Sequence, residues 1–231
     1  MQTISLSLLL IFGITSTLAQ GTVIFNNHVT GTVISHVYLP SPATPGVVQL
    51  GNGPSDFPAG ATDWTGWSPV SGDKFSAQLF AAPGADLPAN SLAPAFPITT
   101  FRTGAFAGFV NSITATLSGV PLLAPVATIQ MRVWDNKSGL ITDWATALAQ
   151  TPGTELLGTS ATINVSPVGG LGAAPPALFG LQRFNLTYNV PKPSTFAFAG
   201  LGAFLLWLAC STKCGNGTLL SLAAQCPRLA R

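Results

Sequence analysis

Apolar and polar side chains alternate with a period of two through several stretches of the chain. Residues 74–81 (KFSAQLFA), 110–120 (VNSITATLSGV), 127–135 (ATIQMRVWD) and 181–188 all follow this pattern. Strict alternation over four or more residues indicates β-strands with two different faces. In 127–135 the apolar side chains at odd positions make the segment the best candidate for a central strand.

Turn signals and one irregular segment complete the pattern. The tetrapeptide GTVI occurs at 21–24 and again at 31–34, with 28–31 as a connection, which predicts a hairpin. Residues 40–72 are rich in Pro and Gly and predict a long loop. In 142–150 the alternation stops, and Thr142 or Asp143 is suited to cap a short helix.

Composition agrees with strands and loops. Charged residues are only 7% of the 231 residues, and the chain has 24 Gly and 19 Pro. Long helices need charged residues on their wet faces, and this supply is absent. About seven strands separated by turns predict an all-β fold, a single β-sandwich or jelly-roll-like domain.

The charge is divided between the domain and the C-terminal end. All seven acids and five of the nine Lys and Arg residues lie in 20–190, so this segment has a net charge of −2, whereas the whole chain has +2. A slightly acidic domain without a basic patch argues against a nucleic-acid partner. All three cysteines follow residue 209, so 20–190 has no disulfide, cysteine nucleophile or thiolate metal site.

The N-terminal residues match a secretory signal. An apolar centre over residues 6–14 is followed by small residues before a cleavage site between Ala19 and Gln20. This pattern predicts export, and the alternative is a buried N-terminal strand or helix.

The C-terminal part contains an apolar run. Residues 196–210 carry no charge, and the uncharged stretch extends over 194–212. It is just long enough for a transmembrane helix that begins after Pro193, with the basic tail in the cytoplasm. The alternative is a C-terminal core helix.

The segment before this run resembles the PEP-CTERM sorting signal of exported bacterial proteins. The resemblance is carried by Val190, Pro191, Lys192, Pro193, Ser194 and Gly200, followed by the apolar run. Lys192 stands where the family has Glu, and 18 residues follow Lys213 where the family usually ends after a few arginines. The resemblance implies initial anchoring in the inner membrane, processing by an exosortase, and residence in an exopolysaccharide-producing envelope or outside the cell.

A looser resemblance covers most of the domain. Residues 19–27 (AQGTVIFNN), 75–85 (FSAQLFAAPGA), 101–110 (FRTGAFAGFV) and 127–139 (ATIQMRVWDNKSG) resemble PEP-CTERM proteins of the Verrucomicrobia type, a set without an assigned activity. Together these features divide the chain into a signal peptide (1–19), an all-β extracytoplasmic domain (20–188), a sorting and transmembrane segment (189–213) and an atypical, disordered tail (214–231).

Aromatic side chains are the first candidate site. Trp64 and Trp67 lie in a polar loop, where exposed rings could stack on sugars, and Trp134 and Trp144 could join such a platform. The alternative for Trp64 and Trp67, which we favour, is a loop plug that packs on the core.

Polar side chains offer weaker candidates. Asp135, Asn136 and Asp143 could hold calcium, although a strand-ending turn explains the same residues and the calcium-loop motif is absent. His28 and His36 lack the spacing of a metal site and fit the surface better. No metal or other cofactor is expected.

The sequence favours a non-catalytic exported envelope or extracellular-matrix protein. The alternative is a carbohydrate-binding module for exopolysaccharide that uses exposed aromatics. A hydrolase is a weaker third hypothesis, because no paired carboxylates or nucleophile motif can be identified.

Overall fold

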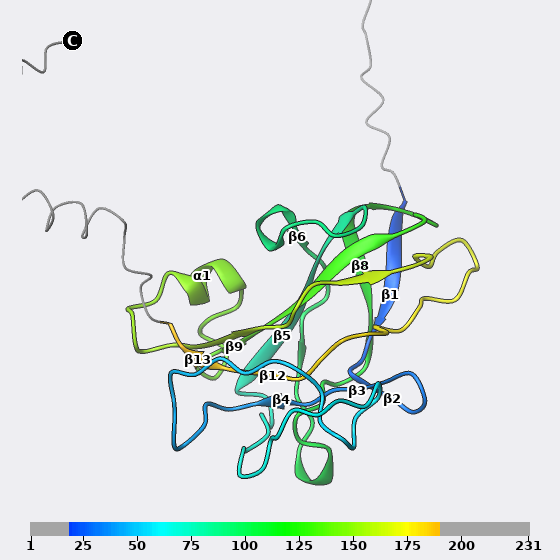
Figure 1. Cartoon of the computed structure of the whole chain (residues 1–231). Helices are drawn as coiled ribbons and strands as arrows, with labels where there is room; N and C mark the ends of the chain where they lie inside the picture. Colours follow the sequence, from blue (N-terminus) through cyan, green and yellow to red (C-terminus); the bar gives the residue numbers. More distant parts are fainter. Residues whose placement is uncertain (1–18, 190–231) are drawn as a thin grey trace, which may run out of the picture. The chain divides into compact units, whose positions relative to one another are not determined.

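The structure is a computed structural model that describes residues 19–189, and within them strands dominate (Figure 1). The predicted all-β class is confirmed. The predicted signal peptide up to residue 18, and the predicted sorting motif, transmembrane helix and tail from residue 190 onward, lie outside the described residues. The predicted cleavage site coincides with the start of the first strand, which begins at Gln20.

The elements follow one another in this order: β1 (Gln20–Phe25), β2 (His28–Val29), β3 (Val33–Ile34), β4 (Val37–Tyr38), β5 (Phe75–Pro83), η1 (Ala89–Ser91), β6 (Ala93–Pro94), β7 (Thr99–Thr100), η2 (Gly104–Phe106), β8 (Ile113–Pro121), β9 (Ala127–Asp135), α1 (Trp144–Leu148), β10 (Leu156–Thr159), β11 (Ile163–Val165), β12 (Phe184–Asn185) and β13 (Thr187–Tyr188).

Strands β5 and β9 form the centre of the main sheet. They pair antiparallel over their whole length, from Phe75 opposite Asp135 to Pro83 opposite Ala127. The strand order is β13-β10-β9-β5-β6, with β11 also on β9 and β7 on β5. The prediction that 127–135 is a central strand is therefore confirmed.

One face of β5 and β9 carries the main core. The inward side chains of β1 and β8 pack there, and β1 pairs with β8 with Val23 opposite Ala115. The buried side chains that meet in this layer include Phe25, Ala77, Leu79, Leu117, Ile129, Met131 and Val133. The β1–β8 pair and the β5–β9 pair thus form two layers around one core, as Figure 1 shows.

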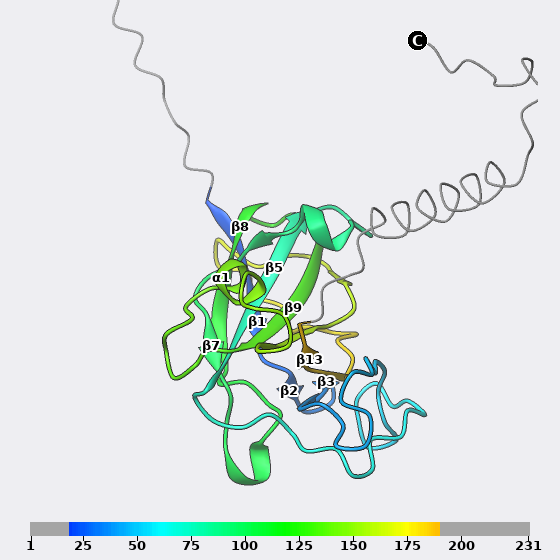
Figure 2. The same cartoon turned by 90° about the vertical axis from the view of Figure 1, so that its left-hand side faces the viewer.

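The other face of β5 and β9 is also covered. Trp134 on β9 packs with Ile141, Ala147 of α1 and Leu157 in a second, smaller core. Figure 2 shows α1 in front of the long strands, with β1 behind them. The polar side chains that alternate along β5 are consequently buried and bonded, and Gln78 Nε2 donates to the Ala95 carbonyl at 3.0 Å.

The predicted hairpin between the two GTVI segments is wrong in its pairing. The first segment lies in β1 and pairs with β8, whose partner residues are about ninety positions away in the chain. A smaller hairpin does form, between β2 and β3, with His28 opposite Ile34. Periodicity identifies strands but does not identify their partners, because register is set by which faces must be buried.

The predicted short helix is confirmed as α1. Asp143 caps it, since its Oδ1 accepts a hydrogen bond from the Thr146 N–H at 2.9 Å. Among residues 19–189 no helix has both the length and the apolar character needed to cross a bilayer.

Candidate functional site

The tryptophan pair of the 40–72 loop is mostly internal. Trp64 is only 6% exposed, its ring stacks on Tyr38 with centroids 4.7 Å apart, and its Nε1 donates to the Gly51 carbonyl at 2.8 Å. Trp67 is half-buried and meets Trp64 edge-on at 5.1 Å. Trp64 is therefore a core-packing plug, the alternative favoured from the sequence, and its burial leaves no ring face open for stacking on a sugar.

Beside this plug lies a buried ion pair that the sequence does not reveal. Asp56 from the loop and Arg183, which precedes β12, face each other through both carboxylate oxygens, and both side chains are almost fully buried. Arg183 Nη1 also donates to the Tyr38 hydroxyl at 3.0 Å, and Asp56 Oδ2 accepts from the Gly53 N–H at 2.6 Å. The pair fastens the long loop to β4 and β12.

The charge on Asp56 is well stabilised. Burial alone would raise the pKa of this carboxyl, but interactions with His36, the Gly53 N–H and Arg183 outweigh it and hold the pKa below its usual value. No solvent-exposed surface reaches the carboxylate, so we assign it a structural role.

The two histidines meet through an aromatic ring. His28 and His36 both pack on Phe109, with ring centroids 4.3 and 4.0 Å away. Burial, Arg102 and His36 lower the pKa of His28. Residues 19–189 contain no group of three His, Cys, Asp or Glu side chains placed to hold a metal ion.

The possible calcium residues are each engaged elsewhere. Asp135 accepts from the Lys137 N–H and Nζ, both at 2.8 Å. Asn136 is buried, where it donates to the Asp73 carbonyl at 2.7 Å and accepts from the Gly139 N–H at 3.1 Å. Asp143 caps α1. The strand-ending turn thus accounts for Asp135 and Asn136, and the three side chains do not form a common cation site.

Asp135 and Glu155 approach one Lys137 ammonium, at 2.8 and 3.5 Å. Glu155 is completely buried, and neither of its carboxylate oxygens accepts a hydrogen bond within residues 19–189. Burial raises the pKa of Glu155, Lys137 opposes this effect, and Asp135 adds to it. A substrate cannot reach Glu155, so this pair does not support the hydrolase hypothesis.

Glu155 gives a pH-dependent prediction. Because its pKa is raised in the folded state, its stabilising contribution is complete below the unfolded pKa of about 4.3 and is lost as the pH rises through the folded value. Glu155→Gln removes this titration. We expect its stability relative to the wild type to improve as the pH rises above about 4.3, by about 1.4 kcal/mol for each unit by which folding raises the pKa. Urea unfolding at several pH values measures this, and a difference independent of pH would contradict it.

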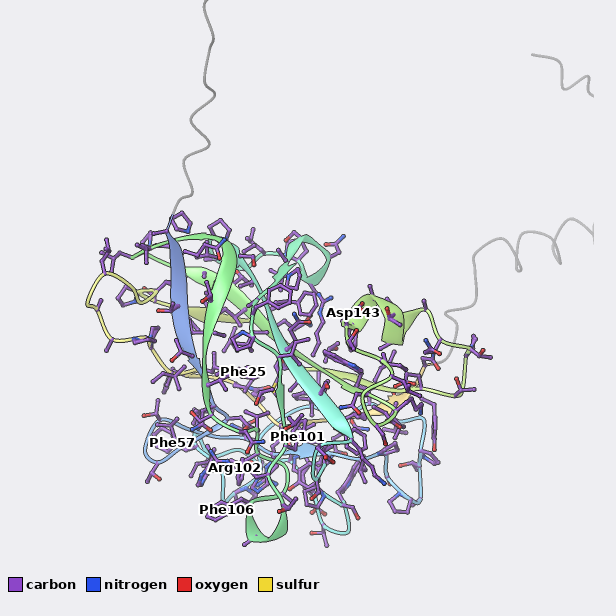
Figure 3. All side chains as sticks on the ribbon, turned by 180° about the vertical axis from the view of Figure 1, so that it is seen from behind. Phe25, Phe57, Phe101, Arg102, Phe106 and Asp143 are labelled. Carbon is purple, nitrogen blue, oxygen red and sulfur yellow. The ribbon has the colours of Figure 1, made fainter. Side chains whose placement is uncertain are left out.

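Two clefts adjoin Trp144, at the start of α1. A cleft of about 260 Å³ lies on one side of this residue and is lined by Gln78, Phe80, Pro94, Phe96, Ile98 and Asp143. A second cleft of about 210 Å³ shares Trp144 and is lined by Val48, Leu148, Leu157, Gly158, Asn185 and Thr187. Figure 3 places Asp143 at the start of α1, away from Phe57, Arg102 and Phe106 at the opposite end.

This site was only partly visible in the sequence. Trp144 could be named as an aromatic candidate, but Phe96 and Gln78 reach the cleft from segments far from α1 in the chain. The only sequence signal for this site was the predicted short helix, whose cap is followed directly by a tryptophan.

No protein-family model, curated protein or solved structure matches the chain.

Proposed function

We propose that the protein is a non-catalytic, exported component of the cell envelope or extracellular matrix. Its all-β part would be a β-sandwich outside the cytoplasm, and the C-terminal segment would be its sorting signal and initial membrane anchor. The observation that carries the proposal is the order of segments: the compact unit ends at Asn189, and the Val-Pro-Lys-Pro motif begins at the next residue.

The attachment of the domain end supports this order. Asn189 Oδ1 accepts from the Gly153 N–H at 2.9 Å, its Nδ2 donates to the Gln150 carbonyl at 3.0 Å, and its backbone N–H donates to the Glu155 carbonyl at 2.9 Å. These bonds fix the end of the domain. A processing enzyme could then cut after this point without disturbing the strands.

The engagement of four carboxylates within residues 19–189 is consistent with the non-catalytic assignment. The carboxylates of Asp56, Asp135 and Asp143 are each held by neighbouring groups, and Glu155 is buried. The second candidate function is an exopolysaccharide-binding module. The clefts beside Trp144 favour this function, and they replace Trp64 and Trp67 as the candidate sugar-binding surface.

Fractionation of the native host with intact-mass analysis tests export and sorting. We expect a mature protein that begins at Gln20 and ends near Pro193, in the envelope or medium, after recognition by an exosortase-like enzyme. A full-length protein confined to the cytosol would overturn the proposal.

Two variants examine the motif itself. Pro193→Ala should cause unprocessed protein to accumulate in the membrane fraction, since the proline marks the start of the apolar run. Lys192→Glu introduces the acidic residue that the PEP-CTERM family has at this position. This variant should be processed at least as well as the parent chain. Equal processing of Pro193→Ala and the parent would argue against recognition of this motif.

A further inference from the structure

The two clefts beside Trp144 have mainly apolar walls and a small number of polar groups. Phe96 is 52% exposed and Trp144 is half-buried, so aromatic surface is open to a ligand in the first cleft. Small-molecule sites typically combine such apolar and aromatic walls with a few polar groups that fix orientation.

Gln78 is the most informative polar group. Gln78 lines the first cleft and is 2% exposed, and its Nε2 donates to the Ala95 carbonyl. Trp144 lines both clefts. A ligand that covers the Gln78 Oε1 and the Trp144 Nε1 must offer each a hydrogen-bond partner, because burying a polar group without one is unfavourable.

These features fit a sugar ring better than a purely apolar molecule. A pyranose has C–H faces that pack on aromatic rings, and hydroxyls around its rim that both donate and accept hydrogen bonds. An apolar ligand would cover Gln78 Oε1 and Trp144 Nε1 without offering either a hydrogen-bond partner. The volume of about 260 Å³ is below the roughly 300–1,000 Å³ of drug-sized sites, which suits one ring per cleft.

The charges near the cleft favour a neutral sugar. Asp143 lies at the rim, and hydrogen bonds from Thr146 keep its pKa low, so its carboxylate is ionised. Arg132 lies over the Phe80 ring, with Cζ 3.9 Å from the ring centroid, and the same Cζ is 5.6 Å from the Trp144 centroid, so Arg132 supplies a positive charge beside both rings. Because Arg132 and Asp143 carry opposite charges, the first cleft has no net attraction for an acidic sugar. The Asp143 carboxylate at the rim also repels such a sugar.

We propose that the two clefts are neighbouring subsites for a neutral polysaccharide, with the Trp144 ring between them. Phe96 and Trp144 provide stacking surface, and Gln78 Oε1, Trp144 Nε1 and the Asp143 carboxylate exchange hydrogen bonds with hydroxyls. The inference deepens the second candidate function. Export and sugar binding are independent outcomes, because binding is measured on purified protein and export is measured in the host.

The test titrates the full chain with neutral hexasaccharides of glucose, galactose and mannose in α and β linkages, and with a galacturonic acid hexamer. Calorimetry should show saturable binding of at least one neutral hexasaccharide, tighter than binding of its monosaccharide. Trp144→Ala should weaken this binding about tenfold or more, as expected for loss of one stacking ring. The matched control Trp67→Ala removes a tryptophan outside the clefts and should bind normally.

Phe96→Ala provides a second variant whose folding should be unaffected, because this side chain is exposed. It should also weaken binding. The inference is overturned if no neutral hexasaccharide binds at millimolar concentration or if the acidic hexamer binds more tightly. It is equally overturned if monosaccharide and hexasaccharide bind alike, or if Trp144→Ala and Phe96→Ala bind as the parent does.

Discussion

Replacing Arg183 by alanine should lower the free energy of unfolding by about 3–5 kcal/mol, because it leaves the Asp56 carboxylate buried without its main partner. The pair joins the 40–72 loop to β4 and β12, and the two residues are separated by 127 positions in the chain. Loss of the pair should therefore loosen the loop, including the Trp64 plug that packs on Tyr38. Chemical denaturation monitored by tryptophan fluorescence measures both effects.

The double variant Asp56→Leu with Arg183→Met distinguishes an unpaired charge from lost packing. A buried ion pair replaced by apolar residues of similar size often loses little stability. The double variant should therefore be more stable than Arg183→Ala, and the coupling can be measured in a double-mutant cycle. Lys74→Ala removes an exposed charge and should change stability by less than about 0.5 kcal/mol.

The pH dependence provides an independent check on the same pair. The pKa of Asp56 is lowered in the folded state, so its contribution is complete above its unfolded pKa of about 3.9 and is lost as the pH falls through the folded value. The destabilisation caused by Arg183→Ala should shrink below about pH 4, because the unpaired carboxyl is then protonated. A destabilisation that stays constant to pH 2 would indicate lost packing alone.

The strands could be predicted because their information is local. Alternation along 110–120 and 127–135 identifies β8 and β9, and Asp143 marks the start of α1. The pairing of β1 with β8 could not be predicted, since the nearby second GTVI segment offers an equally plausible partner. Only the requirement to cover the β5–β9 core selects β8.

The candidate site was harder to predict for a related reason. The polar loop alone left Trp64 and Trp67 either exposed or packed on the core, and the stacking of Trp64 on Tyr38 from another segment decides for packing. Trp144 becomes part of a cleft only because the fold brings Phe96 and Gln78 beside it. Local sequence gives the type of a side chain, and long-range contacts decide whether it is a plug or a wall of a cleft.

Trp134→Ala should destabilise the protein by about 3–5 kcal/mol, as expected for truncation of a fully buried aromatic side chain. Trp134 is 0% exposed, its Nε1 donates to the Ile141 carbonyl at 3.1 Å, and its ring meets Trp144 edge-on at 6.3 Å. It therefore supports both the second core and the main wall of the clefts.

Trp134→Phe is the matched variant, since it keeps an aromatic ring but removes the N–H donor. It should cost less than Trp134→Ala and preserve the position of α1. If the clefts bind neutral sugars, Trp134→Phe should also retain most of the affinity at temperatures where it is folded, because Trp134 itself does not line either cleft. Equal destabilisation by the two variants would show that the bond to Ile141, and not ring packing, holds α1 on the sheet. Thermal unfolding by circular dichroism, combined with the hexasaccharide titration, separates a loss of the scaffold from a loss of the binding surface.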